Sequence, residues 1–140
     1  MNAEAAIIGS ILLSQGDALD EINITSDEFH SAKLGKVFQA LRDMKAKHEA
    51  IDPITLSARM PEHSQEVWSW QSETPTAANV SFYARAVRDN AIRRNLSHTA
   101  QRMLTSDEHT DRDAVIDTAR SELGALAERR TDGKIEYISN

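Results

Sequence analysis

The feature that most restricts the fold is a long stretch, Ala77 to Leu104, that contains neither proline nor glycine. Its apolar residues recur every three or four positions, and this spacing places them on one face of an α-helix. They are Val80, Tyr83, Ala84, Val87, Ala91, Ile92, Leu96, Ala100 and Met103. At a rise of about 1.5 Å per residue, the helix would be about 40 Å long.

A second long helix is predicted after the polar segment Thr105 to Thr110. Thr110 stands three residues before Asp113, which is close to a capping box. The helix is expected to end at Arg129 and Arg130, since basic residues suit a helix C-terminus. Its apolar residues are Val115, Ile116, Ala119, Leu123, Leu126 and Ala127. We therefore predict an antiparallel helical hairpin with more apolar surface than two helices bury between themselves.

Shorter helical patterns occupy the sequence before the hairpin. Asp52 followed by Pro53 predicts a helix N-cap with proline at the first helical position, and the helix should end near Met60. The segment from His63 to Ser72 is consistent with another short helix. Two apolar stripes predict a first helix and an amphipathic helix over about residues 31 to 48: Ile7, Ile8, Ile11 and Leu12, then Leu34, Val37, Phe38, Leu41 and Met44.

These patterns predict an all-α protein, a globular helical bundle followed by a long antiparallel helical hairpin. We expect the head over residues 1–76 and the hairpin over 77–130. After the hairpin, Asp132 and Gly133 predict a turn, and Ile135 to Ile138 alternate like a short strand or an extended linker. Residues 131–140 are therefore expected to begin a linker to a further domain.

Composition narrows the class of protein. The 140 residues contain no cysteine, which excludes a disulfide framework, and no apolar run long enough to span a membrane, so a cytoplasmic protein is expected. Acidic residues outnumber basic ones by 22 to 16, and the net charge of −6 disfavours unaided binding to the phosphate backbone of nucleic acids. Protein partners are expected before DNA, and no direct DNA binding is predicted.

No pattern in the sequence predicts catalysis. The Gly133-Lys134 pair is followed by Ile135, not by the serine or threonine of a Walker A loop. The five histidines show no HExxH context and no spacing of four residues that would suit zinc. We predict no catalytic, cofactor-binding or metal-binding residues in this chain.

Surface residues of the long helix and of the tryptophan segment are candidates for partner contact. The arginines at 85, 88, 93 and 94 could form salt links, dock a protein or, least favoured, bind DNA. Trp68 and Trp70 point to different helix faces, so one can enter the core while the other is exposed. The candidates for partner docking are Arg88, Arg93 and Trp70.

Several segments, in order, resemble the N-terminal domain of DnaB-type replicative DNA helicases. They run from Glu4-Ala5-Ala6-Ile7-Ile8-Gly9-Ser10-Ile11-Leu12-Leu13 through Asp27-Glu28-Phe29-His30, Val37-Phe38-Gln39-Ala40-Leu41 and Ile51-Asp52-Pro53-Ile54-Thr55-Leu56 to Thr74-Pro75-Thr76-Ala77-Ala78-Asn79-Val80. The resemblance covers about residues 3 to 130. The segment from Arg59 to Glu73 is shorter than in the family and lacks its Gly-Gly pair, which suggests a phage or prophage lineage.

The resemblance implies a non-catalytic collar domain above an ATPase ring. In the family, hairpins pair between the subunits of a hexamer, and the collar docks primase and, in some systems, a helicase loader. ATP and Mg²⁺ would belong to a motor domain outside this chain. The residues expected to pack within or between hairpins are Ile92, Leu96, Met103, Val115, Ile116 and Leu123.

A second hypothesis is a free-standing adaptor that uses this fold to bind a replicative helicase, a primase or a loader. A third, a small helical DNA-binding protein, is disfavoured by the negative charge.

Overall fold

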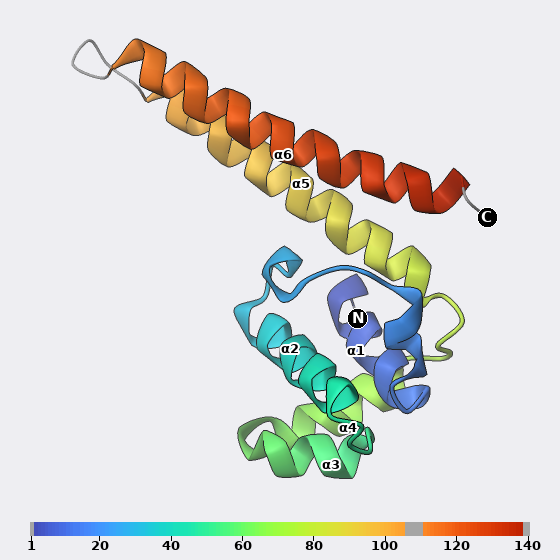
Figure 1. Ribbon diagram of the computed structural model, residues 1–140. Coiled ribbons are helices and arrows are strands. Elements are labelled where there is room, and N and C mark those ends of the chain that lie inside the picture. Colours follow the sequence, from blue (N-terminus) through green and yellow to red (C-terminus); the bar gives the residue numbers. More distant parts are fainter. Residues whose placement is uncertain (1, 106–110, 139–140) are drawn as a thin grey trace. The chain divides into compact units, whose positions relative to one another are not determined.

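The computed structural model describes residues 2–105 and 111–138. All of the regular secondary structure that it assigns to these residues is helical. The predicted all-α class, a helical bundle followed along the chain by a long helical hairpin, is confirmed (Figure 1). The chain divides into two compact units, Met1–Arg88 and Asp89–Asn140. None of the described helices is long and apolar enough to cross a membrane.

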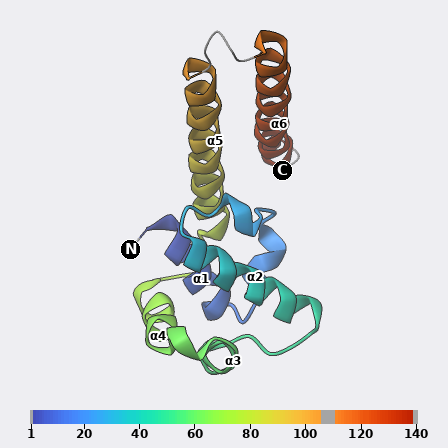
Figure 2. The same ribbon diagram turned by 90° about the vertical axis from the view of Figure 1, so that its left-hand side faces the viewer.

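The first unit contains the short helices. They are α1 (Ala3–Leu13), η1 (Asp17–Glu21), η2 (Ser26–Glu28), α2 (Ala32–Ala46), α3 (Pro53–Arg59), η3 (Pro61–His63), α4 (Ser64–Glu73) and the beginning of α5 (Val80–Leu104). Helix α1 packs against α2 and α4, and α4 also packs against α3. Figure 2 shows α1 beside α2 and α3 beside α4.

The core of this unit consists of the two predicted apolar stripes and the residues that close over them. All nine residues of those stripes are buried: Ile7, Ile8, Ile11, Leu12, Leu34, Val37, Phe38, Leu41 and Met44. The rings of Phe29 and Phe38 lie 5.0 Å apart between their centroids. Val80, Ala84 and Val87 bring the beginning of α5 into the same core.

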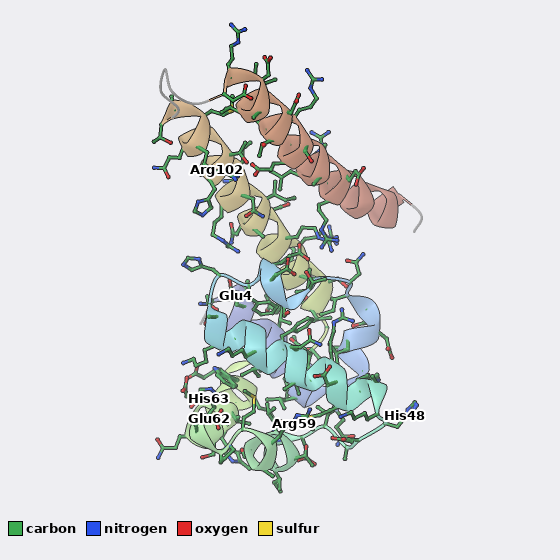
Figure 3. All side chains as sticks on the ribbon, turned by 60° about the vertical axis from the view of Figure 1, so that its left-hand side comes forward. Glu4, His48, Arg59, Glu62, His63 and Arg102 are labelled. Carbon is green, nitrogen blue, oxygen red and sulfur yellow. The ribbon has the colours of Figure 1, made fainter. Side chains whose placement is uncertain are left out.

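Side chains cap the helices of the first unit. The predicted cap at Asp52 is confirmed: Oδ1 accepts a hydrogen bond from the Thr55 amide at 2.8 Å, and Thr55 Oγ1 accepts one from the Asp52 amide at 3.0 Å. Helix α2 is capped locally by Ser31, whose Oγ accepts a hydrogen bond from the Leu34 amide at 3.2 Å, and the chain that enters the helix is held by a distant residue. The carboxylate of Glu4, on α1, accepts hydrogen bonds from the amides of His30 and Ser31 at 2.7 and 3.0 Å (Figure 3).

Gly9 lies inside α1, where α4 passes very close. A Cβ atom at this position would lie 1.9 Å from Thr74 Oγ1 and 2.3 Å from the carbonyl oxygen of Trp70. The crossing of the two helices therefore depends on the missing side chain. Gly16, at φ +95°, adopts the left-handed conformation just after α1, and the chain turns there.

The second unit contains the rest of α5 and the helix α6 (Arg112–Ile138). Helix α5 ends at Leu104 as predicted, and the polar segment and the predicted cap at Thr110 fall mostly outside the described residues. The expected turn at Asp132-Gly133 and the strand after it are wrong, because α6 continues to Ile138. Glycine disfavours a helix by only about 1 kcal/mol, and no proline follows to stop it.

Candidate functional site

The hairpin of the second unit carries large apolar side chains that remain about half exposed. The exposed fractions are 48% for Leu96, 47% for Met103, 46% for Ile116 and 41% for Leu123. Leu96 and Met103 are seven residues apart on α5, as are Ile116 and Leu123 on α6. Because seven residues make nearly two helical turns, each pair lies on one face of its helix.

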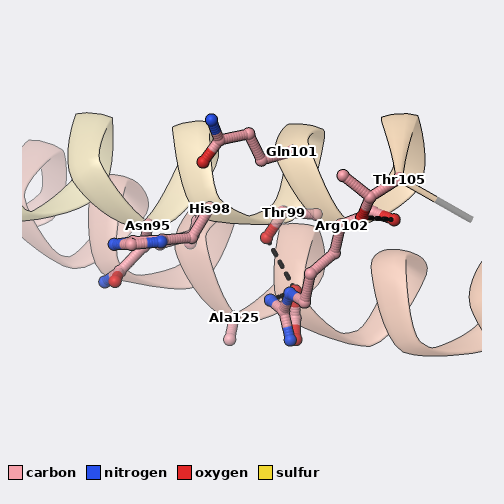
Figure 4. Close-up of a pocket in the computed structure, with 9 residues that line it drawn as sticks. Asn95, His98, Thr99, Gln101, Arg102, Thr105 and Ala125 are labelled. Carbon is pink, nitrogen blue, oxygen red and sulfur yellow. Dashed lines mark hydrogen bonds and ion pairs between the residues drawn. The ribbon is translucent and has the colours of Figure 1, made fainter.

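A polar cluster joins the two helices across their seam. The hydroxyl of Thr99, on α5, donates a hydrogen bond of 2.7 Å to Glu122 Oε2 on α6. Arg102 Nη2, one turn further along α5, donates to the same oxygen and forms an ion pair with it (Figure 4). The Thr99 hydrogen bond, and then the one from Arg102, lower the pKa of Glu122 below its usual value.

This cluster defines which sides of the helices face each other. At about 100° per residue, Met103 and Leu96 are turned roughly 40° and 60° from Thr99 around α5. Leu123 and Ile116 are turned roughly 100° and 120° from Glu122 around α6, in the same rotational sense. In antiparallel helices the same sense leads to the same side of the pair. The four side chains therefore share one side of the hairpin, which we call the apolar face.

The opposite side of the hairpin holds a polar groove with a volume of about 820 Å³. Asn95, His98, Gln101, Arg102 and Thr105 line it from α5, and Ala125 and Leu126 line it from α6. Figure 4 shows Gln101 directed away from α6, and Ala125 on the helix across the groove. The hairpin thus has one apolar side and one polar side.

The residues predicted to pack within or between hairpins fall into two groups. Ile92 and Val115 are half-buried within the hairpin, whereas Leu96, Met103, Ile116 and Leu123 form the apolar face. Their role in contacts with a second chain stays a prediction.

Two of the three predicted docking residues lie inside the first unit. Arg88 is 5% exposed; its Nε donates to Glu28 Oε2 at 3.2 Å, and its Nη2 donates to Asn23 Oδ1 at 2.9 Å. Trp70 is 7% exposed and belongs to the core, whereas Trp68 is 51% exposed. We therefore withdraw Arg88 and Trp70 as surface residues, because their side chains already serve internal contacts. Arg93 is exposed.

The prediction of Trp70 as a docking residue is wrong, and the spacing of the apolar residues on α4 already favours Trp68 as the exposed tryptophan. Val67 and Trp70 are three residues apart and share the buried face of α4, while Trp68 is turned about 100° from Val67. The prediction also missed the seam cluster. Val115, Ala119, Glu122 and Leu126 recur at intervals of four, three and four on α6, so Glu122 occupies a core position of a helical stripe.

Other sites for chemistry are not evident in the described part of the chain. A second Gly-Lys pair, Gly35-Lys36, lies inside α2 and is followed by Val37, so it does not match a Walker A loop. Among the described residues, no three His, Asp or Glu side chains are grouped so that they could hold a metal ion.

The chain is similar to replicative DNA helicases of bacteria over about a third of their length. It is 29% identical to the replicative DNA helicase DnaB of Geobacillus stearothermophilus, over all of this chain and 33% of that protein. It is 30% identical to DnaB of Haemophilus influenzae, over 92% of this chain and 30% of that protein. The chain thus spans about a third of the length of these curated relatives.

Solved structures give the same result. The crystal structure of the N-terminal domain of DnaB helicase from Mycobacterium tuberculosis matches 88% of this chain and 94% of that chain, with a TM-score of 0.74 and 25% identity. A structure of a DnaB-like replicative helicase, described with its interactions with primase, shares the fold at a TM-score of 0.70 and 20% identity, over 89% of this chain and 31% of that chain.

The family model described as "DnaB-like helicase N terminal domain" matches residues 1–89, more than half of the chain. The resemblance predicted from the sequence is therefore confirmed. This chain belongs to the DnaB-like helicase N-terminal domain family.

Proposed function

We propose that this chain is the non-catalytic collar domain of a replicative DNA helicase and that it associates with further copies of itself through the apolar face of the hairpin. One observation carries the proposal: Leu96, Met103, Ile116 and Leu123 remain 41–48% exposed on one side of an extended helical pair. Burying such side chains against a second hairpin removes apolar surface from water at about 25 cal/mol per Å². In a full-length protein this pairing would help to build a hexamer.

The proposal assigns the chemistry to another part of a longer protein. The family match concerns an N-terminal domain, and the chain spans about a third of its curated relatives. ATP and Mg²⁺ would accordingly bind to a motor domain outside these residues. A helicase of this kind would act on DNA in the cytoplasm.

The collar is also proposed to dock primase, a helicase loader or both. A structure with the same fold is described with its interactions with primase, and this supports a docking role for the domain. Arg93 stays a candidate for such contacts because its side chain is exposed, and Trp68 joins it because 51% of its surface is exposed. Tryptophan and arginine are enriched among the residues that dominate protein interfaces.

Light scattering over a concentration series tests the self-association. The wild-type chain should gain mass with concentration, and the double variant Leu96→Asp/Leu123→Asp should stay a monomer, since burying unpaired charge at the contact is unfavourable. The double variant Gln101→Asp/Ser121→Asp adds the same charge to exposed positions away from the apolar face and should behave like wild type. A wild-type chain that stays monomeric at every concentration, or two variants with the same mass curve, would contradict the proposal.

A further inference from the structure

The seam of the hairpin holds polar groups where helical pairs usually bury apolar ones. Thr99 is 3% exposed and is directed at Glu122, whose side chain is 30% exposed. One carboxylate oxygen, Oε2, accepts from both Thr99 and Arg102. The cluster therefore satisfies a buried hydroxyl and neutralises a carboxylate at a single point between the helices.

The neighbouring core positions of α6 cannot replace Glu122. The adjacent residues of its stripe are Ala119, one turn before, and Leu126, one turn after. If α6 slid by one turn, a movement of roughly 5 Å, one of these two would lie opposite Thr99. Neither carries an acceptor, so the buried hydroxyl would lose its partner and the Glu122 carboxylate would lose two donors. Thr99 is buried, so the loss of this acceptor disfavours such an arrangement.

Apolar packing along the seam defines the alignment much less. Ala119 is buried, while Val115 and Leu126 are only half-buried. Alanine presents a single methyl group, so a shifted helix would meet a similar surface. Grooves with volumes of about 820 and 220 Å³ lie beside the cluster, so parts of the seam face open space and not a close-packed neighbour.

We propose that Thr99, Glu122 and Arg102 fix the register of α6 against α5, and that this register aligns Leu96 and Met103 with Ile116 and Leu123 on the apolar face. A polar group at a core position sets register in helical pairs at the expense of stability. The consequence for pairing rests on the self-association proposed above, whereas the register belongs to the single chain.

Distances between spin labels measure the register directly. Because the sequence contains no cysteine, Asn90→Cys and Ser121→Cys place one label on each helix at exposed positions that are offset by about 15 Å along the axis, so that a slide of α6 changes the distance between them. The distance between the two labels is then measured by pulsed electron–electron double resonance on the full chain. The labelled chain is diluted with unlabelled chain, so that only distances within one molecule contribute. The doubly labelled chain in which Thr99, Glu122 and Arg102 are unchanged, here called the parent, should give one narrow distance distribution.

The variant Thr99→Val/Glu122→Met removes the cluster while keeping similar volumes. It should keep its helical circular dichroism and unfold at the same or a higher temperature, yet its distance distribution should broaden or shift, because a slide by one turn moves the two labels roughly 5 Å relative to each other along the axis. Its self-association should weaken, because the two halves of the apolar face no longer align. The matched control Glu128→Gln removes an exposed carboxylate from the same helix and should leave the distribution unchanged.

A narrow distribution at the parental distance in the double variant would overturn the proposal. If that variant loses its helices, the variant Glu122→Gln tests the proposal instead. It keeps an acceptor for Thr99 but loses the ion pair with Arg102, so its distance distribution should broaden partially. An unchanged distribution in this variant would also overturn the proposal. If the wild-type chain stays monomeric in light scattering, the proposed pairing of hairpins is contradicted. The spin-label distances would still test the register within one chain.

Discussion

Replacing Gly9 with alanine should weaken the first unit, because α1 and α4 meet at this residue. The new Cβ would lie 1.9 Å from Thr74 Oγ1 and 2.3 Å from the carbonyl oxygen of Trp70. Thr74 could rotate, but its hydroxyl already donates to that carbonyl at 2.7 Å. The carbonyl is part of the α4 backbone and cannot rotate away. The helices must therefore separate by roughly 1 Å to reach ordinary contact distances.

The expected loss of stability follows from three opposing effects. Overpacking of a close crossing destabilises by about 1–3 kcal/mol, and disturbing the Thr74 hydrogen bond adds about 1 kcal/mol. Alanine returns about 1 kcal/mol, since it favours a helix more than glycine does. The net loss is roughly 2 kcal/mol, which lowers the unfolding midpoint of a unit of this size by about 8–16 °C.

The same substitution at Gly124 provides the matched control. This residue lies in α6, and a Cβ there would meet nothing within 4 Å. Gly124→Ala should therefore stabilise its helix by about 0.5–1 kcal/mol. Thermal and urea unfolding, followed by circular dichroism, compare both variants with wild type. A Gly9→Ala protein as stable as wild type would refute the close crossing of α1 and α4.

Three further predictions concern the first unit. Arg88→Met should destabilise it by about 3 kcal/mol in urea unfolding, because the Glu28 carboxylate stays buried without its guanidinium; an unchanged midpoint would show that the pair contributes nothing. Asp52→Ala should reduce the free energy of unfolding by about 1 kcal/mol through loss of the α3 cap, with an unaffected value counting against it. The hydrogen bond from Lys33 lowers the pKa of Glu66. The stability that this exposed pair contributes is therefore present above the unfolded pKa near 4.5 and is lost as pH falls through the folded pKa. Lys33→Met should flatten the pH dependence of the unfolding midpoint, and the same slope in both proteins would exclude this contribution.

Local patterns were enough to predict most of the fold. The stripe around Phe38 has a helical period that only one face can bury, and Asp52 before Pro53 starts a helix by chemistry confined to a few residues. At Gly133 the same kind of local rule failed, because a glycine makes a helix end possible without requiring it.

Contacts between distant residues could not be predicted from such patterns. Glu28 and Arg88 are 60 residues apart, and although Arg88 lies beside the apolar stripe, no local pattern identifies Glu28 as its partner. The seam cluster was hidden for a different reason. Thr99 and Glu122 are polar, so a pattern of apolar residues does not include them. Polar residues at core positions nevertheless indicate a buried polar contact when the apolar stripe around them is continuous.

The hydrogen bonds that Glu4 accepts link α1 to the chain that enters α2. The carboxylate is supplied from α1, yet the two amides that it satisfies belong to His30 and Ser31, more than twenty residues later in the chain. An isolated peptide containing α2 would keep the Ser31 cap but lose these two hydrogen bonds, so the chain that enters the helix should be less ordered in the peptide than in the protein. Removing the first helix would therefore expose the apolar core and also release the chain that enters α2. The head is thus expected to unfold cooperatively, because α1 holds both the core and the approach to α2.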